Sequence, residues 1–189
     1  KVRDDNPQIG GYLRMEMRER GKLVGVREGS NIWTLTGREY IVETITLETL
    51  TPRAKFRDDA LLYFGLGDGV TPEVAEIAAL VSPVEYIAGE FLAQTQVPVT
   101  FPSDATGTPR TSVQLIREYA TTEISIGGNV VLTEFGCFTD GDPTNNNIPP
   151  RPTDMATAGS QAPVGYKNFE PFTKTTTRTL RVIYELRVV

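Results

Sequence analysis

The chain has 189 residues, with 19 Lys and Arg against 24 Asp and Glu, so its formal net charge is -5. A mildly acidic chain lacks the basic face that phosphate binding needs, and nucleic acid is not an expected partner. No apolar run approaches the roughly 20 residues of a membrane span, and no segment resembles a signal peptide, so no membrane partner is expected. The length favours a single domain over residues 1–189.

The side chains that usually perform chemistry are scarce. The chain has no histidine, and Cys137 is its only cysteine. These counts exclude an intrachain disulfide and a thiolate-rich metal site, and they remove the commonest general base. We therefore expect no enzyme activity, no catalytic residues, no metal and no cofactor. Because Cys137 lies in an apolar run, it is expected to be an inert buried thiol.

The first third of the chain predicts an arm, a hairpin and a helix. Residues 1–11 are polar and are expected to form an N-terminal arm. Alternation over residues 12–18 and an apolar stretch at 23–26, separated by Arg20-Gly21, predict a β-hairpin. Thr36 and Glu39 have the spacing of a capping box, which predicts one short helix over residues 37–49.

Five later segments have the apolar patterns of strands, at residues 60–66, 90–100, 112–120, 130–138 and 178–189. The first of them ends at three closely spaced glycines, Gly65, Gly67 and Gly69. Val70 breaks the Gly-x-Gly-x-x-Gly pattern, so we expect a turn with positive φ angles and no phosphate-binding loop.

The last strand and the proline-rich segment before it define the expected fold class. Over residues 178–189, Val182, Tyr184 and Leu186 should face the core, while Arg181 and Arg187 face solvent or a partner. Residues 140–165 are rich in Pro and Asn and predict a long loop, which either contacts a neighbouring subunit or extends over the surface. We expect an all-β, antiparallel β-sandwich (jelly-roll-like) with one short α-helix and this extended loop.

Four aspartates are candidate site residues. Asp58 and Asp59 are adjacent, so in a strand they would point to opposite faces and could not act as a pair. Asp140 and Asp142 could contribute to a calcium site, but the further acids of an EF-hand loop are missing. A solvated turn is the better interpretation of that segment.

Three glutamates, Glu118, Glu123 and Glu134, lie in or near predicted strands. Any two of them could form the acid/base pair of a glycosidase if the fold brought them together. The favoured interpretation places all three on the charged outer faces of strands. Trp33, the only tryptophan, is expected to anchor the core and not to stack on a sugar.

Several segments resemble structural proteins of tailed bacteriophages. Residues 60–69, ALLYFGLGDG, resemble an apolar strand followed by Gly-x-Gly-Asp/Thr-Gly. Residues 131–138, VLTEFGCF, are similar to a Thr-Glu-Phe/Ile/Val-Gly-Leu-Phe motif, with Cys137 at the aliphatic position. Residues 166–174 and the closing strand are similar to an aromatic-Pro-x-x-Lys segment, and residues 21–24 with Asn31 resemble the start of the same group.

The resemblance covers most of the chain in order, although residues 140–165 are longer than in the shorter members. It implies a non-enzymatic virion protein that forms symmetric homo-oligomers with other virion proteins as partners, at the tail, neck, baseplate or a fibre attachment. We expect a tail or neck adaptor or collar component, located in the virion and assembled in the host cytoplasm. The alternatives are a capsid decoration protein and, from another class, a carbohydrate-binding module or carboxylate-based glycosidase. In this interpretation Glu134 fixes a turn or a cross-strand pair, and Gly136 allows close backbone approach.

Overall fold

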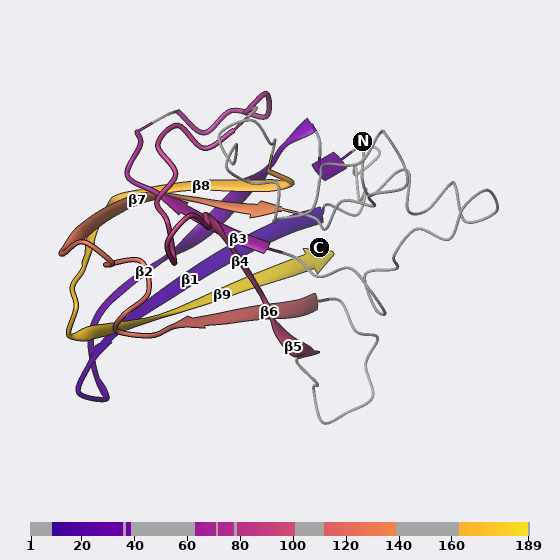
Figure 1. Ribbon diagram of the computed structural model, residues 1–189. Coiled ribbons are helices and arrows are strands. Elements are labelled where there is room, and N and C mark those ends of the chain that lie inside the picture. Colours follow the sequence, from indigo (N-terminus) through magenta and orange to yellow (C-terminus); the bar gives the residue numbers. More distant parts are fainter. Residues whose placement is uncertain are drawn as a thin grey trace, which may run out of the picture.

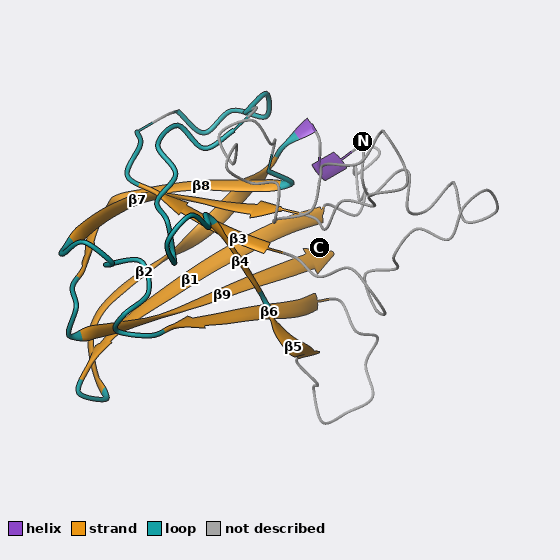
Figure 2. Cartoon of the chain, in the orientation of Figure 1, coloured by secondary structure: helices purple, strands orange, loops and turns teal. Residues whose placement is uncertain are grey.

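The computed structural model describes residues 9–35, 37–38, 63–70, 72–77, 79–100, 112–138 and 163–188. Figure 2 shows that strands dominate the described part of the chain, where helix is confined to positions 35, 37 and 38. The predicted all-β class is therefore confirmed. The nine strands are β1 (Ile9–Glu19), β2 (Lys22–Trp33), β3 (Tyr63–Gly67), β4 (Leu92–Gln94), β5 (Gln96–Thr100), β6 (Ser112–Tyr119), β7 (Val130–Phe138), β8 (Gly165–Lys174) and β9 (Arg178–Val188).

One antiparallel sheet holds all these strands, in the order β4-β3-β7-β8-β2-β1-β9-β6-β5 (Figure 1). The two ends of this order, β4 and β5, are separated in the chain by Thr95 alone. β4 pairs with β3, whereas β5 pairs with β6, so one short segment of chain lies at both ends of the sheet. The sheet therefore curls back toward itself and is nearly barrel-shaped.

The predicted first hairpin is confirmed. Glu19 pairs with Lys22, and the two residues between them, Arg20 and Gly21, have φ angles of 50° and 79°. Positive φ at both central positions is the type I′ geometry, whose twist matches that of the flanking strands. β1 begins at Ile9, so the predicted arm is wrong for residues 9–11, and residues 1–8 lie outside the described residues.

The inward faces of β1 and β9 supply much of the core. β9 lies between β1 and β6 and pairs with both, so its two edges are covered, while one of its faces packs in the core. Val182 and Tyr184 are fully buried and Leu186 is 9% exposed, whereas Arg181 is half-exposed, which confirms the predicted orientation of these residues. The side chain of Arg187 lies outside the described set. The other buried hydrophobic residues of β1 and β9 are Leu13, Met15, Met17 and Leu180.

The glycines of β3 differ from the prediction. Gly65 and Gly67 lie inside the strand, and neither they nor Gly69 has a positive φ. A Cβ atom on Gly65 would lie 2.7 Å from Leu92 Cδ2, and one on Gly67 would lie 2.6 Å from the Ser82 carbonyl oxygen. The expected positive-φ turn is therefore wrong. Glycine is required because neighbouring groups pack directly against the β3 backbone.

The helix begins earlier than predicted. Thr34 Oγ1 accepts a hydrogen bond from the Gly37 N–H at 3.1 Å, and the Thr34 carbonyl accepts one from the Arg38 N–H. Thr34 therefore caps this first turn, and the predicted capping residues Thr36 and Glu39 lie outside the described residues. The remainder of the predicted helix, residues 39–49, lies outside the described residues.

Most of the predicted 140–165 loop also lies outside the described residues, as do Asp58, Asp59, Asp140 and Asp142. Its end is an exception, because Val164 is buried and its N–H donates to the Cys137 carbonyl at 2.7 Å. β8 then begins at Gly165, so the last residues of the predicted loop belong to the packed sheet. The single domain over residues 1–189 stays a prediction.

The burial of β9 predicts the cost of shortening its side chains. Leu186→Ala should lower the free energy of unfolding by about 2–5 kcal/mol, because the cavity it leaves is enclosed by the sheet. Ile183→Ala, on the half-exposed outer face of the same strand, is the matched control and should cost less than half as much. Urea denaturation of both variants checks the register. Equal costs would show that the assigned faces of β9 are wrong.

Candidate functional site

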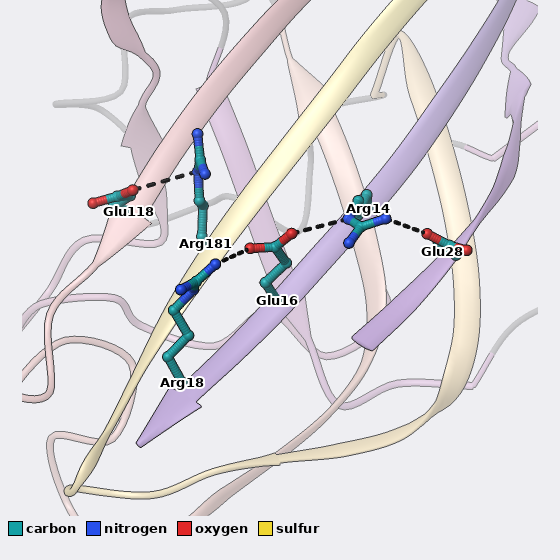
Figure 3. Close-up of polar contacts among 6 residues, drawn as sticks. All are labelled: Arg14, Glu16, Arg18, Glu28, Glu118 and Arg181. Atoms are coloured by element: carbon teal, nitrogen blue, oxygen red, sulfur yellow. Dashed lines mark hydrogen bonds and ion pairs between the residues drawn. The ribbon is translucent and has the colours of Figure 1, made fainter. Parts of the chain in front are cut away.

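Charged side chains lie on the outer face of β2, β1, β9 and β6 (Figure 3). Even-numbered residues of β1 point outward, because residues two apart in a strand share a face and Leu13, Met15 and Met17 point inward. Arg14 donates to Glu28 Oε2 and to Glu16 Oε1, each at 3.0 Å, and Arg18 donates to Glu16 Oε2 at 2.9 Å. We call the set of Arg14, Glu16, Arg18, Glu28, Glu118 and Arg181 the outer charged face.

Glu16 is the most enclosed member of this face. It is only 7% exposed, although it lies on the outer side of the sheet, because the flanking Arg14 and Arg18 side chains reach it from both sides. The hydrogen bond from Arg18, and then that from Arg14, holds the pKa of Glu16 below its ordinary value against the opposing effect of burial. Glu16 is therefore a structural carboxylate, ionised and doubly paired.

A pocket of about 540 Å³ opens among members of this face. It brings together two of the candidate glutamates, Glu118 and Glu123. Glu118 lies 3.3 Å from Arg181 Nε, while Glu123 accepts hydrogen bonds at 2.6 Å from both Arg117 and the Ala120 N–H. The lining residues are Arg18, Glu118, Tyr119, Ala120, Glu123, Thr179, Leu180 and Arg181. Both carboxylates therefore already have cationic partners.

Glu134 is in a different place from the other two glutamates. It lies on the face of β7 opposite the core residues Phe135 and Cys137, as expected, but the 81–82 backbone covers it and it is fully buried, so its expected exposure is wrong. Its carboxylate accepts hydrogen bonds from the Ser82 N–H at 3.0 Å, the Val81 N–H at 3.3 Å and the Tyr166 hydroxyl at 2.9 Å. The expectation that Glu134 fixes a turn is confirmed, because it holds the 81–82 backbone against the sheet.

Three other residues singled out in the sequence are packed. Trp33 is buried, and Cys137 is fully buried, where burial raises the pKa of its thiol and keeps it neutral. A Cβ atom on Gly136 would lie 2.7 Å from the Phe138 ring and 3.1 Å from Leu80 Cδ2. Gly136 therefore allows close approach, but the approaching groups are side chains and not the expected backbone.

Lys174 is a buried polar residue that the sequence reasoning missed. Its ammonium group donates to the Thr175 and Thr121 carbonyls at 3.1 and 3.2 Å and lies 3.4 Å from Ser125 Oγ. Burial lowers the pKa of Lys174 to about 8, with Glu123 partly opposing the shift. The sequence feature that could have indicated its burial is its position two residues after the inward-facing Phe172, because residues two apart in a strand lie on the same face.

Within the described ranges, no group of three or more His, Cys, Asp or Glu could hold a metal ion. None of the helical residues described forms a segment long and apolar enough to cross a membrane. Comparison of the chain with family models, curated proteins and solved structures found no match. The resemblance to tailed-phage proteins therefore stays a hypothesis, and the proposal of a function depends on the geometry described above.

The three hydrogen bonds to Glu134 predict a large effect of a small change. Glu134→Gln keeps the side-chain shape but turns one acceptor into a donor, facing N–H or O–H groups that also donate. The variant should lose about 1–3 kcal/mol of unfolding free energy. Glu118→Gln, at a side chain that is 59% exposed, should change it by less than about 0.5 kcal/mol. Urea denaturation followed by Trp33 fluorescence measures both, and equal losses would contradict the structural role of Glu134.

The lowered pKa of Lys174 predicts that stability rises with pH. The unfolded chain keeps this proton up to an ordinary pKa of 10.5, whereas the folded chain releases it near 8, so the unfolded state binds more protons between these values. The free energy of unfolding should then increase by at most about 1.4 kcal/mol per pH unit above about pH 8. Lys174→Met should remove this increase. Parallel pH profiles for the two proteins, measured below the ordinary tyrosine pKa of about 10, would contradict the assignment.

Proposed function

We propose that the protein is a non-enzymatic structural component of a tailed-phage virion, a tail or neck adaptor or collar piece that works through protein–protein contacts. The observation that carries the proposal is that each of the three candidate glutamates already has an ion-pair or hydrogen-bond partner within the fold. Glu118 and Glu123 pair with arginines, and Glu134 holds the backbone of a turn. A general acid or base must be available to a substrate proton, and these groups are committed to the fold.

The outer charged face supports the same proposal. It presents ion pairs across β2, β1, β9 and β6 with half-exposed aliphatic residues between them, such as Ile116 and Ile183. Surfaces that mix arginine, paired charges and aliphatic side chains are suited to contacts with other proteins. The proposed partners are other virion proteins and further copies of this chain, in a symmetric homo-oligomer located in the virion.

We also propose that the curled sheet is a jelly-roll-like sandwich in which β4-β3-β7-β8 face β2-β1-β9-β6-β5. The aromatic contacts across the core support two facing layers. The Tyr184 ring of β9 lies 5.6 Å from the Phe135 ring of β7 and 6.2 Å from the Phe64 ring of β3, measured between ring centroids.

Two alternatives remain. A capsid decoration protein would use the same surfaces at a different place on the particle. A carbohydrate-binding module or carboxylate-based glycosidase is favoured by one observation, the presence of Glu118 and Glu123 in one pocket. Tyr119, the aromatic residue in that lining, is only 1% exposed, so it offers no ring face on which a sugar could stack.

The proposal predicts where the protein is found. Gold-labelled antibodies raised against the purified chain should mark tailed particles from the same source at the tail or neck, and antibodies from a non-immunised animal should not. Label on the head would favour the capsid alternative. Particles without label, together with polysaccharide hydrolysis that Glu118→Gln or Glu123→Gln abolishes, would replace the proposal with the glycosidase.

A further inference from the structure

One edge of β2 is free along most of the strand. β2 pairs with β1 over residues 22–31, but it meets β8 only at Ile32 and Trp33, and the two strands diverge from there (Figure 1). Where a further pair would form, the Asn168 N–H of β8 donates to Glu73 Oε1 at 2.9 Å and not to β2. No residue of 22–31 is buried. Among the described residues, the sheet is therefore open on this side of β2.

The backbone groups that this edge presents follow from both ends of the strand. In an antiparallel pair, alternate residues direct their N–H and carbonyl to the partner strand, and the residues between them direct theirs away. The two-residue turn makes Glu19 and Lys22 a hydrogen-bonded pair, and counting along β1 across the β-bulge assigns the odd-numbered positions of 25–31 to β1. At the other end, the Thr34 N–H donates to the Val164 carbonyl just before β8, so even-numbered positions face away from β1. The two ends give the same assignment.

Three residues therefore direct backbone groups to the open edge, namely Val26, Glu28 and Ser30. The Val26 carbonyl accepts a hydrogen bond from the Arg27 guanidinium at 2.9 Å. The three N–H groups and the carbonyls of Glu28 and Ser30 have no hydrogen-bond partner in the described part of the chain. A row of alternating donors and acceptors is complementary to the backbone of another extended segment, as in recognition by strand addition.

The other edge strands are protected against strand addition. β8 contains Pro171, which has no N–H, and Arg27 donates to the Glu170 and Pro171 carbonyls, each at 3.1 Å. β5 contains Pro98, and β4 has only three residues. Proline, short length and charged side chains are the devices that keep sheet edges from pairing. β2 has twelve residues and no proline, so it is the described edge that can accept a strand.

A second copy of β2 is a poor occupant of this edge. When two β2 edges pair in the antiparallel sense, the register that uses all three residues places Val26 opposite Ser30 and Glu28 opposite Glu28. Like charges directly opposite each other destabilise a sheet. The Glu28 side chain is 46% exposed and favours a lysine or arginine opposite it. The edge therefore suits a segment of different sequence that carries a basic residue.

We propose that the open edge of β2, residues 26–30, binds an extended segment of another virion protein, which adds to the sheet as a strand beside β2. The segment has no proline at its pairing positions and carries a basic residue opposite Glu28. The inference rests on the proposed function, because it names the surface through which this component attaches to its neighbour. It fixes the partner as a different protein, so pairing of two copies through this edge contradicts it.

Hydrogen–deuterium exchange with residue-level mass spectrometry tests the edge in the isolated chain and in intact particles. In the isolated chain, the Val26, Glu28 and Ser30 amides should exchange rapidly, while pairing with β1 protects the Arg27 and Gly29 amides. In particles, exchange at the first three should be slower by roughly a hundredfold or more, with Arg27 and Gly29 as the internal control. Slow exchange of the three in the isolated chain, at any concentration, contradicts the inference.

A proline variant separates backbone pairing from side-chain contact. Glu28→Pro removes an N–H that the described fold does not use, at an edge position where proline is tolerated. Glu28→Ala removes the same carboxylate and keeps the N–H, so it is the matched control. When each variant is produced in the host during infection, Glu28→Pro should enter particles roughly tenfold less than Glu28→Ala, because the added strand loses a hydrogen-bond donor and meets the proline ring. Equal incorporation overturns the inference.

Two further readings separate the possible failures. Urea denaturation of both purified variants shows whether Glu28→Pro is folded, and if it is not, the exchange experiment on the unaltered chain decides. Particles that contain the chain but show rapid exchange at Val26, Glu28 and Ser30 overturn this inference alone. Particles that lack the chain overturn the proposed function, and this inference with it.

Discussion

Closure of the sheet by the short segment that contains β4 and β5 is the constraint on which the other features depend. Thr95 alone separates a strand that pairs with β3 from one that pairs with β6, so the two ends of the sheet cannot move apart. The inward faces of the strands are therefore enclosed, and their side chains form a core without a covering helix in the described residues.

Polar groups are buried in three different ways. Lys174 is enclosed inside the curled sheet, whereas Glu134 lies on the face of β7 opposite Phe135 and Cys137 and is covered by the 81–82 backbone. Each of the two is satisfied by three partners that include backbone groups. On the outside, Glu16 is shielded by arginines from its own strand and not by the core. Buried charge is tolerated in all three places because hydrogen bonds replace the lost water.

Local pattern predicted the strands well where one face is apolar and the other polar. The β1–β2 hairpin and β9 follow from alternation and from Arg20-Gly21, since both signals act within a few residues. β8 carried no such signal, because Pro171 and the charged Lys167 and Glu170 interrupt its apolar positions. The role of the β3 glycines depends on Leu92 and Ser82, which are close in space but distant in sequence, so turn propensity was the wrong principle there.

The candidate site was less predictable, because its members come from separate strands. Sequence could name Glu118, Glu123 and Glu134 but not their surroundings, and only the register shows that the first two share a pocket while the third is buried elsewhere. The alternation of charge along β1 was visible in the sequence. Its continuation onto β9 and β6 depends on the pairing of β1 with β9, which no short-range pattern specifies.

The attachment of the 81–82 turn to Glu134 has a consequence for how this protein can vary. The carboxylate binds main-chain N–H groups, so the attachment is indifferent to the side chains at these two positions. Val81 is 59% exposed, and its side chain contributes nothing to the hydrogen bonds that hold the turn. Sequence change can therefore accumulate here while the backbone stays in place, with proline as the exception because it lacks the N–H. The turn is a site where new surface chemistry can be introduced on an unchanged scaffold.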